Sequence, residues 1–363
     1  MIRVCFVCPN AASIFFPDLP VTHGGAEAQL SWFARELATR RDFDVHFVLR
    51  GEAGRPAEQR DGLTLHFTPH QAGLRQKLRL QRLLWRIGAD IYLEQGHGSL
   101  PKEIAFFRLW SRKHFVYWVA HDFDLVPPQG MALSRRLFLW GMLRASGMIT
   151  QTTVQQETLK RRFGRDSVLI RNACPARPPS DLPRRNILWI GRFVPVKRPE
   201  LFIDLARRMP SEDFLMVAPL GNAEAREYFA KHEDAIRSTP NLTFVPGVPL
   251  SETDALFDRA RLLVLTSKGE GYPNTIMQAM WAGTPIATYD FDPDGIVASR
   301  ELGVSVQGDW DGFVDEIRSL LDDKARLATC RLRAHAFATE HHDIEKNTGA
   351  LCDYFRELGG RVR

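Results

Sequence analysis

Short apolar runs alternate along the first half of the chain with longer stretches whose apolar positions recur every three or four residues. The runs of strand length are residues 3–8, 44–49, 63–67, 90–94 and 115–120. Helical spacing is clearest over residues 28–40 and 74–87. Buried strands that alternate with helices predict a parallel sheet wound on both faces.

The same alternation restarts after a proline-rich segment, residues 173–183. The later apolar runs are residues 186–190, 214–218, 242–245, 262–265 and 285–288, with a helix over 199–209 and a last one over 343–359. The predicted fold class is therefore α/β, with two Rossmann-like doubly wound domains facing a cleft. The expected divisions are a first domain over 1–172, a linker over 173–185, a second domain over 186–340 and a final helix over 341–363. In such sheets ligands bind at the carboxyl ends of the strands.

Composition narrows the class of protein. A chain of 363 residues with 44% hydrophobic and 25% charged residues fits two soluble domains. No apolar run approaches the roughly 20 residues that a membrane span needs. Five scattered cysteines are typical of reduced thiols in a cytoplasmic protein, and Cys5 and Cys8 are interpreted as buried thiols because no second ligand pair follows them.

Charge is distributed unevenly between the two halves. Residues 1–172 hold 24 Lys and Arg against 15 Asp and Glu, a net charge of +9, whereas the remainder has a net charge of −4. A basic half indicates an anionic partner such as a membrane surface, a lipid-linked phosphate or an acidic glycan. Nucleic acid is not expected, since no binding motif accompanies the charge. The segment of residues 74–87 is basic and amphipathic and contains no acidic residue. It fits two interpretations equally well: a helix that binds an anionic membrane, or a helix that packs on the core and has a solvated basic face.

The most informative stretch is residues 267–285. It follows an apolar run, passes through a loop of small residues, enters a predicted helix near Asn274 and ends in Gly283-Thr284-Pro285. A helix N-terminus offers backbone N–H groups and a positive dipole end to a phosphate. Glu270 in the loop and Gln278 in the helix could bind hydroxyl groups on either side of that phosphate, as a nucleotide sugar would require.

This stretch resembles the donor-binding motif of the retaining glycosyltransferases of family 4, which have the GT-B fold. Their pattern is Glu, seven residues, Glu, then Ala-Met and a Gly-x-Pro turn, and here the two acidic positions are Glu270 and Gln278. The resemblance implies transfer of a sugar, with retention, from a UDP- or GDP-linked donor to a saccharide or lipid-linked acceptor. No metal and no other cofactor is expected, because no Asp-x-Asp motif stands in a convincing context. The resemblance also implies that the final helix crosses back to the first domain.

Residues 191–199 are similar to a second motif of that family, Gly-Arg-x4-Lys. The resemblance assigns Arg192 and Lys197 to the diphosphate, whose negative charge grows as it leaves. Arg198 is expected to be a surface charge.

By the same resemblance Glu270 binds donor-sugar hydroxyls and Gln278 binds a ribose hydroxyl. Pro273 stands where the family usually has glycine and removes one N–H donor. Because the amide of Gln278 lacks charge assistance, we expect weaker nucleotide binding and predict that Gln278→Glu tightens it. The backbone positions expected around the phosphate are Gly271, Tyr272, Asn274 and Thr275.

Further residues are assigned by resemblance. Gly247 and Val248 correspond to the segment that contacts the base edge. Gly24 and Gly25 correspond to a Gly-Gly-x-Glu helix entry that contacts donor or acceptor. His121, after a strand of the first half, matches the family's cleft histidine, which contacts the donor sugar.

Other functions stay open at this stage. One is a GT-B nucleotide-sugar epimerase, and another is a non-catalytic nucleotide-sugar-binding protein, which the departures at Gln278 and Pro273 favour. A dinucleotide-dependent oxidoreductase is disfavoured because no Gly-x-Gly-x-x-Gly follows the first strand.

Overall fold

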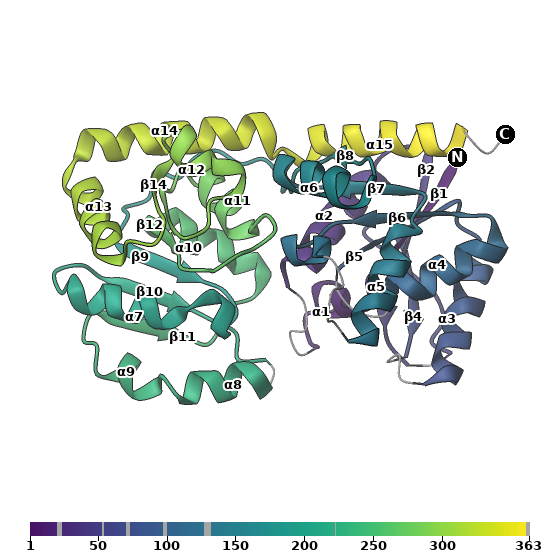
Figure 1. Cartoon of the computed structure of the whole chain (residues 1–363), viewed down its shortest axis with the longest axis horizontal. Coiled ribbons are helices and arrows are strands. Elements are labelled where there is room, and N and C mark those ends of the chain that lie inside the picture. Colours follow the sequence, from purple (N-terminus) through teal and green to yellow (C-terminus); the bar gives the residue numbers. More distant parts are fainter. Residues whose placement is uncertain are drawn as a thin grey trace. The chain divides into compact units, whose positions relative to one another are not determined.

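The computed structural model describes residues 1–19, 24–52, 54–69, 73–96, 100–126, 132–221 and 223–360. The chain divides into two compact units (Figure 1). Unit 1 consists of residues 1–175 together with 344–363, and unit 2 of residues 176–343. Each unit has its own sheet and its own core.

The sheet of unit 1 has the strand order β3-β4-β2-β1-β5-β6-β7-β8. All pairs are parallel except β3 with β4. The strands are β1 (Ile2–Val7), β2 (Phe43–Arg50), β3 (Glu58–Arg60), β4 (Leu63–Thr68), β5 (Ile91–Gln95), β6 (His114–Trp118), β7 (Gly147–Thr150) and β8 (Val168–Leu169).

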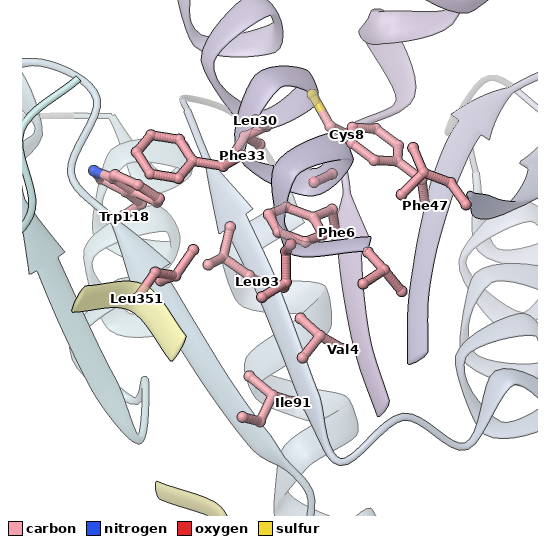
Figure 2. Close-up of a cluster of buried hydrophobic side chains, with 14 of the residues drawn as sticks. Val4, Phe6, Cys8, Leu30, Phe33, Phe47, Ile91, Leu93, Trp118 and Leu351 are labelled. Carbon is pink, nitrogen blue, oxygen red and sulfur yellow. The ribbon is translucent and has the colours of Figure 1, made fainter. Parts of the chain in front are cut away.

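Helices cover both faces of this sheet, because successive residues of each strand point to opposite sides. Leu93 of β5 lies in a core shared with Phe33 of α2 and Leu351 of α15 (Figure 2). Tyr92, one residue earlier, lies in a second core shared with Leu84 of α3. The helices are α1 (Ala12–Phe15), α2 (Gly25–Ala38), α3 (Leu74–Ile87), α4 (Leu100–Ser111), α5 (Leu133–Leu143), α6 (Thr153–Phe163) and α15 (Ile344–Gly360).

The sheet of unit 2 is entirely parallel, with the order β11-β10-β9-β12-β13-β14. The strands are β9 (Asn186–Ile190), β10 (Phe214–Val217), β11 (Leu242–Val245), β12 (Ala260–Leu265), β13 (Ile286–Tyr289) and β14 (Gly303–Val306). The helices are α7 (Pro199–Arg208), α8 (Ala223–Ala230), α9 (Glu233–Arg237), α10 (Thr253–Arg259), α11 (Asn274–Trp281), α12 (Ile296–Ser299), α13 (Trp310–Asp322) and α14 (Lys324–His341). The predicted class, two doubly wound α/β sheets, is confirmed.

Two histidines on neighbouring strands of unit 1 form a close pair. His46 Nδ1 lies 2.8 Å from His66 Nε2, and the rings stack with centroids 5.1 Å apart. The carboxylate of Asp44 lies 3.2 Å from His46 Nε2. Burial, followed by the nearby His46 and Arg3, lowers the pKa of His66 from 6.5 to about 4.

We predict that unit 1 loses stability as the pH falls from about 6.5 towards 4. In that range unfolded His66 binds a proton that folded His66 does not, so acid stabilises the unfolded state relative to the folded one. The measurement is urea unfolding at pH 7 and pH 5 for the wild type and for His66→Gln. The variant should lose less stability between the two pH values, and an equal loss in both proteins would contradict the prediction.

Candidate functional site

The loops after β9 and β12 lie together, because these strands are neighbours in the sheet. The short turn of Pro195–Lys197 follows β9 and precedes α7. Thr266 Oγ1 donates a hydrogen bond to the carbonyl of Lys197 at 2.6 Å, and the Lys268 N–H donates to the carbonyl of Val196 at 3.0 Å. The two loops are therefore joined through their backbones at the carboxyl end of the sheet.

Lys197 and Glu270 form an ion pair within these loops. Only 18% of the lysine side chain and 11% of the glutamate side chain are exposed. Ser267 Oγ also donates to Glu270 Oε1, at 2.6 Å. The structure thus brings together two residues that the sequence selected from motifs more than 70 positions apart, and each neutralises the other.

Arg192 belongs to the same loop but has a different environment. Its side chain is exposed, and it makes no ion pair within the part of the chain that the structure describes. A cation without an internal partner can bind an anion without first breaking a contact, whereas a cation in an ion pair, such as Lys197 with Glu270, would first have to give up its partner.

Arg198 was predicted to be a surface charge, and this is wrong. Only 12% of its side chain is exposed, and its Nη1 lies 2.7 Å from Asp290 Oδ2. The guanidinium also donates to the carbonyls of Thr266, Ser267 and Tyr289. Arg198 therefore fixes the ends of β12 and β13 beneath the loop that holds Glu270. No sequence signal predicts this role, because every one of these partners is at least 68 positions away.

Helix α11 begins at Asn274, directly after Pro273. Its other end is closed by hydrogen bonds from the Gly283 N–H to Met280 and from the Thr284 N–H to Ala279, with Gly283 at a φ of 62°. The predicted helix start and the predicted Gly-Thr-Pro stop are both confirmed. The N-terminal turn, which follows the Glu270 loop, presents the positive end of the dipole.

Tyr272 lies in this loop with its side chain buried. Its hydroxyl is 2.7 Å from His342 Nε2, and the two rings are 4.9 Å apart. Because the side chain packs against His342, a ligand at this loop would meet the backbone of Gly271 and Tyr272. The side chain of Asn274 and that of Thr275 are half-buried at the helix start.

Gln278 is buried, with 7% of its surface exposed, so it is not a helix surface residue. Its amide nitrogen donates to Thr253 Oγ1 at 3.1 Å and to Asp254 Oδ1 at 3.3 Å. Both partners lie at the start of α10. The sequence selected Gln278 but not these two residues.

Gly247 follows β11 with a φ of 92°, a conformation that favours glycine. A Cβ at this position would lie 3.2 Å from the Cα of Pro219, in the loop after β10. The close approach of the two loops therefore requires glycine here. Val248 follows it and is half-buried.

In unit 1, Gly24 and Gly25 form the start of α2, as predicted, although the helix begins three residues earlier than its apolar pattern indicated. The Gly24 N–H donates to Glu27 Oε2 at 2.8 Å, so Glu27 caps the helix.

His121 follows β6 and begins a short turn. Its Nδ1 accepts a hydrogen bond from the Phe123 N–H at 3.3 Å, and its ring stacks on that of Phe123. Asp124 Oδ2 accepts from the N–H groups of Ala120 and His121, both at 3.0 Å, and from the Tyr117 hydroxyl at 3.1 Å. Asp124, which the sequence analysis did not select, thus fixes the backbone that carries His121.

Glu94, at the end of β5, is a second residue that sequence reasoning missed. Its carboxyl is buried, and burial together with the nearby Asp124 and Glu27 raises its pKa well above the usual value. In the sequence, the one feature that could have identified Glu94 is its position as an acidic residue at the end of an apolar strand.

None of the helices among the described residues is long and apolar enough to cross a membrane.

Comparison with known proteins finds a family match within the second half of the chain. Residues 173–336 match the family Glycosyl transferases group 1. The D-inositol 3-phosphate glycosyltransferase of Mycolicibacterium paratuberculosis is 27% identical over 176 residues, which cover 47% of this chain and 40% of the relative. The poly(ribitol-phosphate) alpha-N-acetylglucosaminyltransferase of Staphylococcus aureus is 21% identical over 277 residues, covering 73% of this chain and 55% of the relative. These matches thus span about half, or less, of each relative's length.

Solved structures show the same fold over nearly the whole chain. The sucrose-phosphate synthase of Thermosynechococcus elongatus superposes with a TM-score of 0.79 at 16% identity, covering 99% of this chain and 100% of that one. Anabaena HepE, in a complex with UDP-glucose, superposes with a TM-score of 0.78 at 16% identity, covering 98% and 100%. The fold of the chain is therefore GT-B.

We predict that Arg198→Met destabilises the protein by about 3 kcal/mol, because it leaves Asp290 and three carbonyl groups without their buried partner. Arg237→Met is the matched control: its ion pair with Glu233 is exposed, and its loss should cost within about 0.5 kcal/mol. Urea unfolding measures both. Equal stability of the two variants would show that Arg198 does not stabilise the site.

Proposed function

We propose that this chain, whose residues 173–336 match the glycosyl transferases group 1, moves a hexose-type sugar from a nucleoside-diphosphate sugar to an acceptor hydroxyl. The observation that carries the proposal is the ion pair of Lys197, in the loop between β9 and α7, with Glu270, in the loop that precedes the N-terminus of α11. The names of the relatives and the UDP-glucose complex of HepE support the donor class.

In this proposal unit 2 binds the donor. Arg192, Lys197 and the start of α11 bind the diphosphate, because two cations and a helix dipole suit a group of high negative charge. Glu270 accepts hydrogen bonds from sugar hydroxyls and Gln278 from the ribose. The backbone around Gly271 contacts phosphate, and that of Gly247 and Val248 contacts the base.

Unit 1 provides the acceptor side. Its Gly24-Gly25 helix start contacts donor or acceptor, and His121 contacts the donor sugar. The net charge of +9 on residues 1–172 suits an acceptor linked to an anionic lipid or glycan, as in the assembly of surface polysaccharide or glycolipid.

The proposed chemistry is same-face displacement with retention. The bond from the anomeric carbon to the diphosphate oxygen breaks, a bond to the acceptor oxygen forms, and the acceptor proton passes to the departing phosphate. Lys197 and Arg192 stabilise the charge that this oxygen gains, so no metal is needed. When the diphosphate takes Lys197, Glu270 is released to the sugar hydroxyls.

Calorimetric titration with UDP, GDP and ADP, with and without magnesium, tests the donor site. We expect the protein to prefer one of the three diphosphates and to bind it equally well with and without magnesium. Binding of none of the three would overturn the proposal. Binding of the matching nucleotide sugar without transfer or hydrolysis would favour a non-catalytic binding protein, and an epimerised sugar as product would favour an epimerase.

We predict that Lys197→Ala and Arg192→Ala each lower kcat/KM by about 100-fold or more, the order of magnitude for losing a group that stabilises developing charge. Lys231→Ala is the control, because that lysine is exposed and pairs only with Glu227 among the described residues. Turnover is measured on the selected nucleotide sugar, with unfolding curves to show that the fold persists. Near-normal rates in both site variants would remove the diphosphate assignment.

We further propose that α3 and α4 bind an anionic membrane. The inner face of α3 fills the core, yet its outer face exposes apolar residues next to those of α4, and the rings of Trp85 and Trp110 stack 5.2 Å apart. Exposed aromatic residues beside basic ones suit the interface of a negatively charged bilayer. The exposed apolar residues are Leu74, Leu78, Trp85, Phe106, Leu109 and Trp110.

Removing two charges of α3, by Arg79→Gln with Arg82→Gln, should weaken binding to vesicles that contain phosphatidylglycerol by roughly 30-fold, since each basic residue near such a surface contributes about 1 kcal/mol. Lys160→Gln with Arg161→Gln removes the same charge from α6 and should have little effect. Co-sedimentation measures both. Equal binding by the two double variants would show that α3 does not bind the membrane and only supports the fold.

A further inference from the structure

The hydrogen bonds around Gln278 have fixed directions. The hydroxyl of Thr253 donates its proton to the carbonyl of Leu250 at 2.7 Å. Its oxygen is therefore left as an acceptor, and it accepts from Gln278 Nε2 at 3.1 Å. A hydroxyl has a single proton, so the group of Gln278 that faces Thr253 has to be the amide nitrogen.

Asp254 imposes the same orientation independently. Its Oδ1 lies 3.3 Å from Gln278 Nε2, and an ionised carboxylate can only accept. Both contacts place the NH2 group towards α10 and leave Oε1 on the other side of the amide. Within the described part of the chain, Gln278 Oε1 accepts no hydrogen bond. This oxygen is also absent from the set of fully buried side-chain atoms that lack a partner, so it is accessible to solvent.

Arg177 holds this arrangement in place. Its guanidinium forms an ion pair with Asp258, lies 3.9 Å from Asp254 Oδ1, and donates to the backbone carbonyl of Gln278 at 3.4 Å. The side chain is 19% exposed. One cation from the segment before β9 therefore joins α10, at Asp258 and more distantly at Asp254, to the middle of α11.

We propose that Thr253 and Asp254 are positioning residues that present Oε1 of Gln278 as an oriented acceptor for a ribose hydroxyl of the nucleotide. The inference rests on the proposed function. It also explains why an amide occupies position 278. A carboxylate there would face the Asp254 carboxylate and a Thr253 oxygen whose proton is already donated, so three acceptors would meet without a proton between them.

This inference makes the opposite prediction to the one made from the motif. Gln278→Glu should weaken nucleotide binding, because the new charge is repelled by Asp254 at about the distance of the present hydrogen bond. The double variant Gln278→Glu with Asp254→Asn should recover binding at least to the wild-type level, since the introduced asparagine amide can donate to the new carboxylate.

The experiment is calorimetry with the preferred diphosphate among UDP, GDP and ADP and with its 2′-deoxy and 3′-deoxy forms. For the wild type, loss of one of these hydroxyls should raise Kd by roughly fivefold, the effect of one neutral hydrogen bond of about 1 kcal/mol. Thr253→Val combined with Asp254→Ala removes both acceptors that orient the amide, so in this double variant the ratio should fall to within about twofold of one, while the deoxy form binds as before. Thr243→Val, an exposed threonine on β11, should keep the wild-type ratio.

The outcomes separate this inference from the function on which it rests. If the wild type binds none of the three diphosphates, the proposed function fails and the inference fails with it. If the wild type distinguishes the deoxy form and the double variant Thr253→Val with Asp254→Ala does so equally well, the inference alone is overturned. A tighter Kd for the single variant Gln278→Glu would also overturn it, because Asp254 would then exert no constraint.

Discussion

The parallel pairing of β9 with β12 is the constraint on which the candidate site depends. It places the loop that carries Lys197 beside the loop that carries Glu270, although the two residues are 73 positions apart. The hydrogen bond from Thr266 to the carbonyl of Lys197 and the contacts of Arg198 then fix the loops to each other and to β13. The strand pairing and these hydrogen bonds therefore set the relative positions of Lys197 and Glu270 through the main chain.

The fold was predictable because buried parallel strands are short, nearly continuous apolar runs. Strands β9 and β11 and helix α3 have the predicted bounds, and most other elements shift by one or two residues. Helices such as α6 gave a weaker signal. Its sequence is mostly polar, and only Gln155 and Leu159 of that helix are buried. A helix that packs through so few side chains leaves little periodicity to detect.

The candidate site was predictable where a motif names a residue type and a spacing, as for Lys197 and Glu270. It was not predictable where a role depends on partners distant in sequence. The burial of Arg198 depends on Asp290, 92 positions later, and the orientation of Gln278 depends on Thr253 and Asp254. A motif identifies the chemical group at a position, but the neighbours of that group decide whether a change from carboxylate to amide weakens a site or suits it.

The assignment of α15 to unit 1 has a consequence for folding during synthesis. Unit 2 is one continuous segment inserted into unit 1, and the chain returns to unit 1 where it left, with the Ile344 N–H donating to the carbonyl of Cys174. Leu351 and Phe355 of α15 belong to the core of α2 and β1. On the ribosome unit 2 can therefore complete its core first, while the earlier-made unit 1 keeps apolar surface open until the last helix emerges.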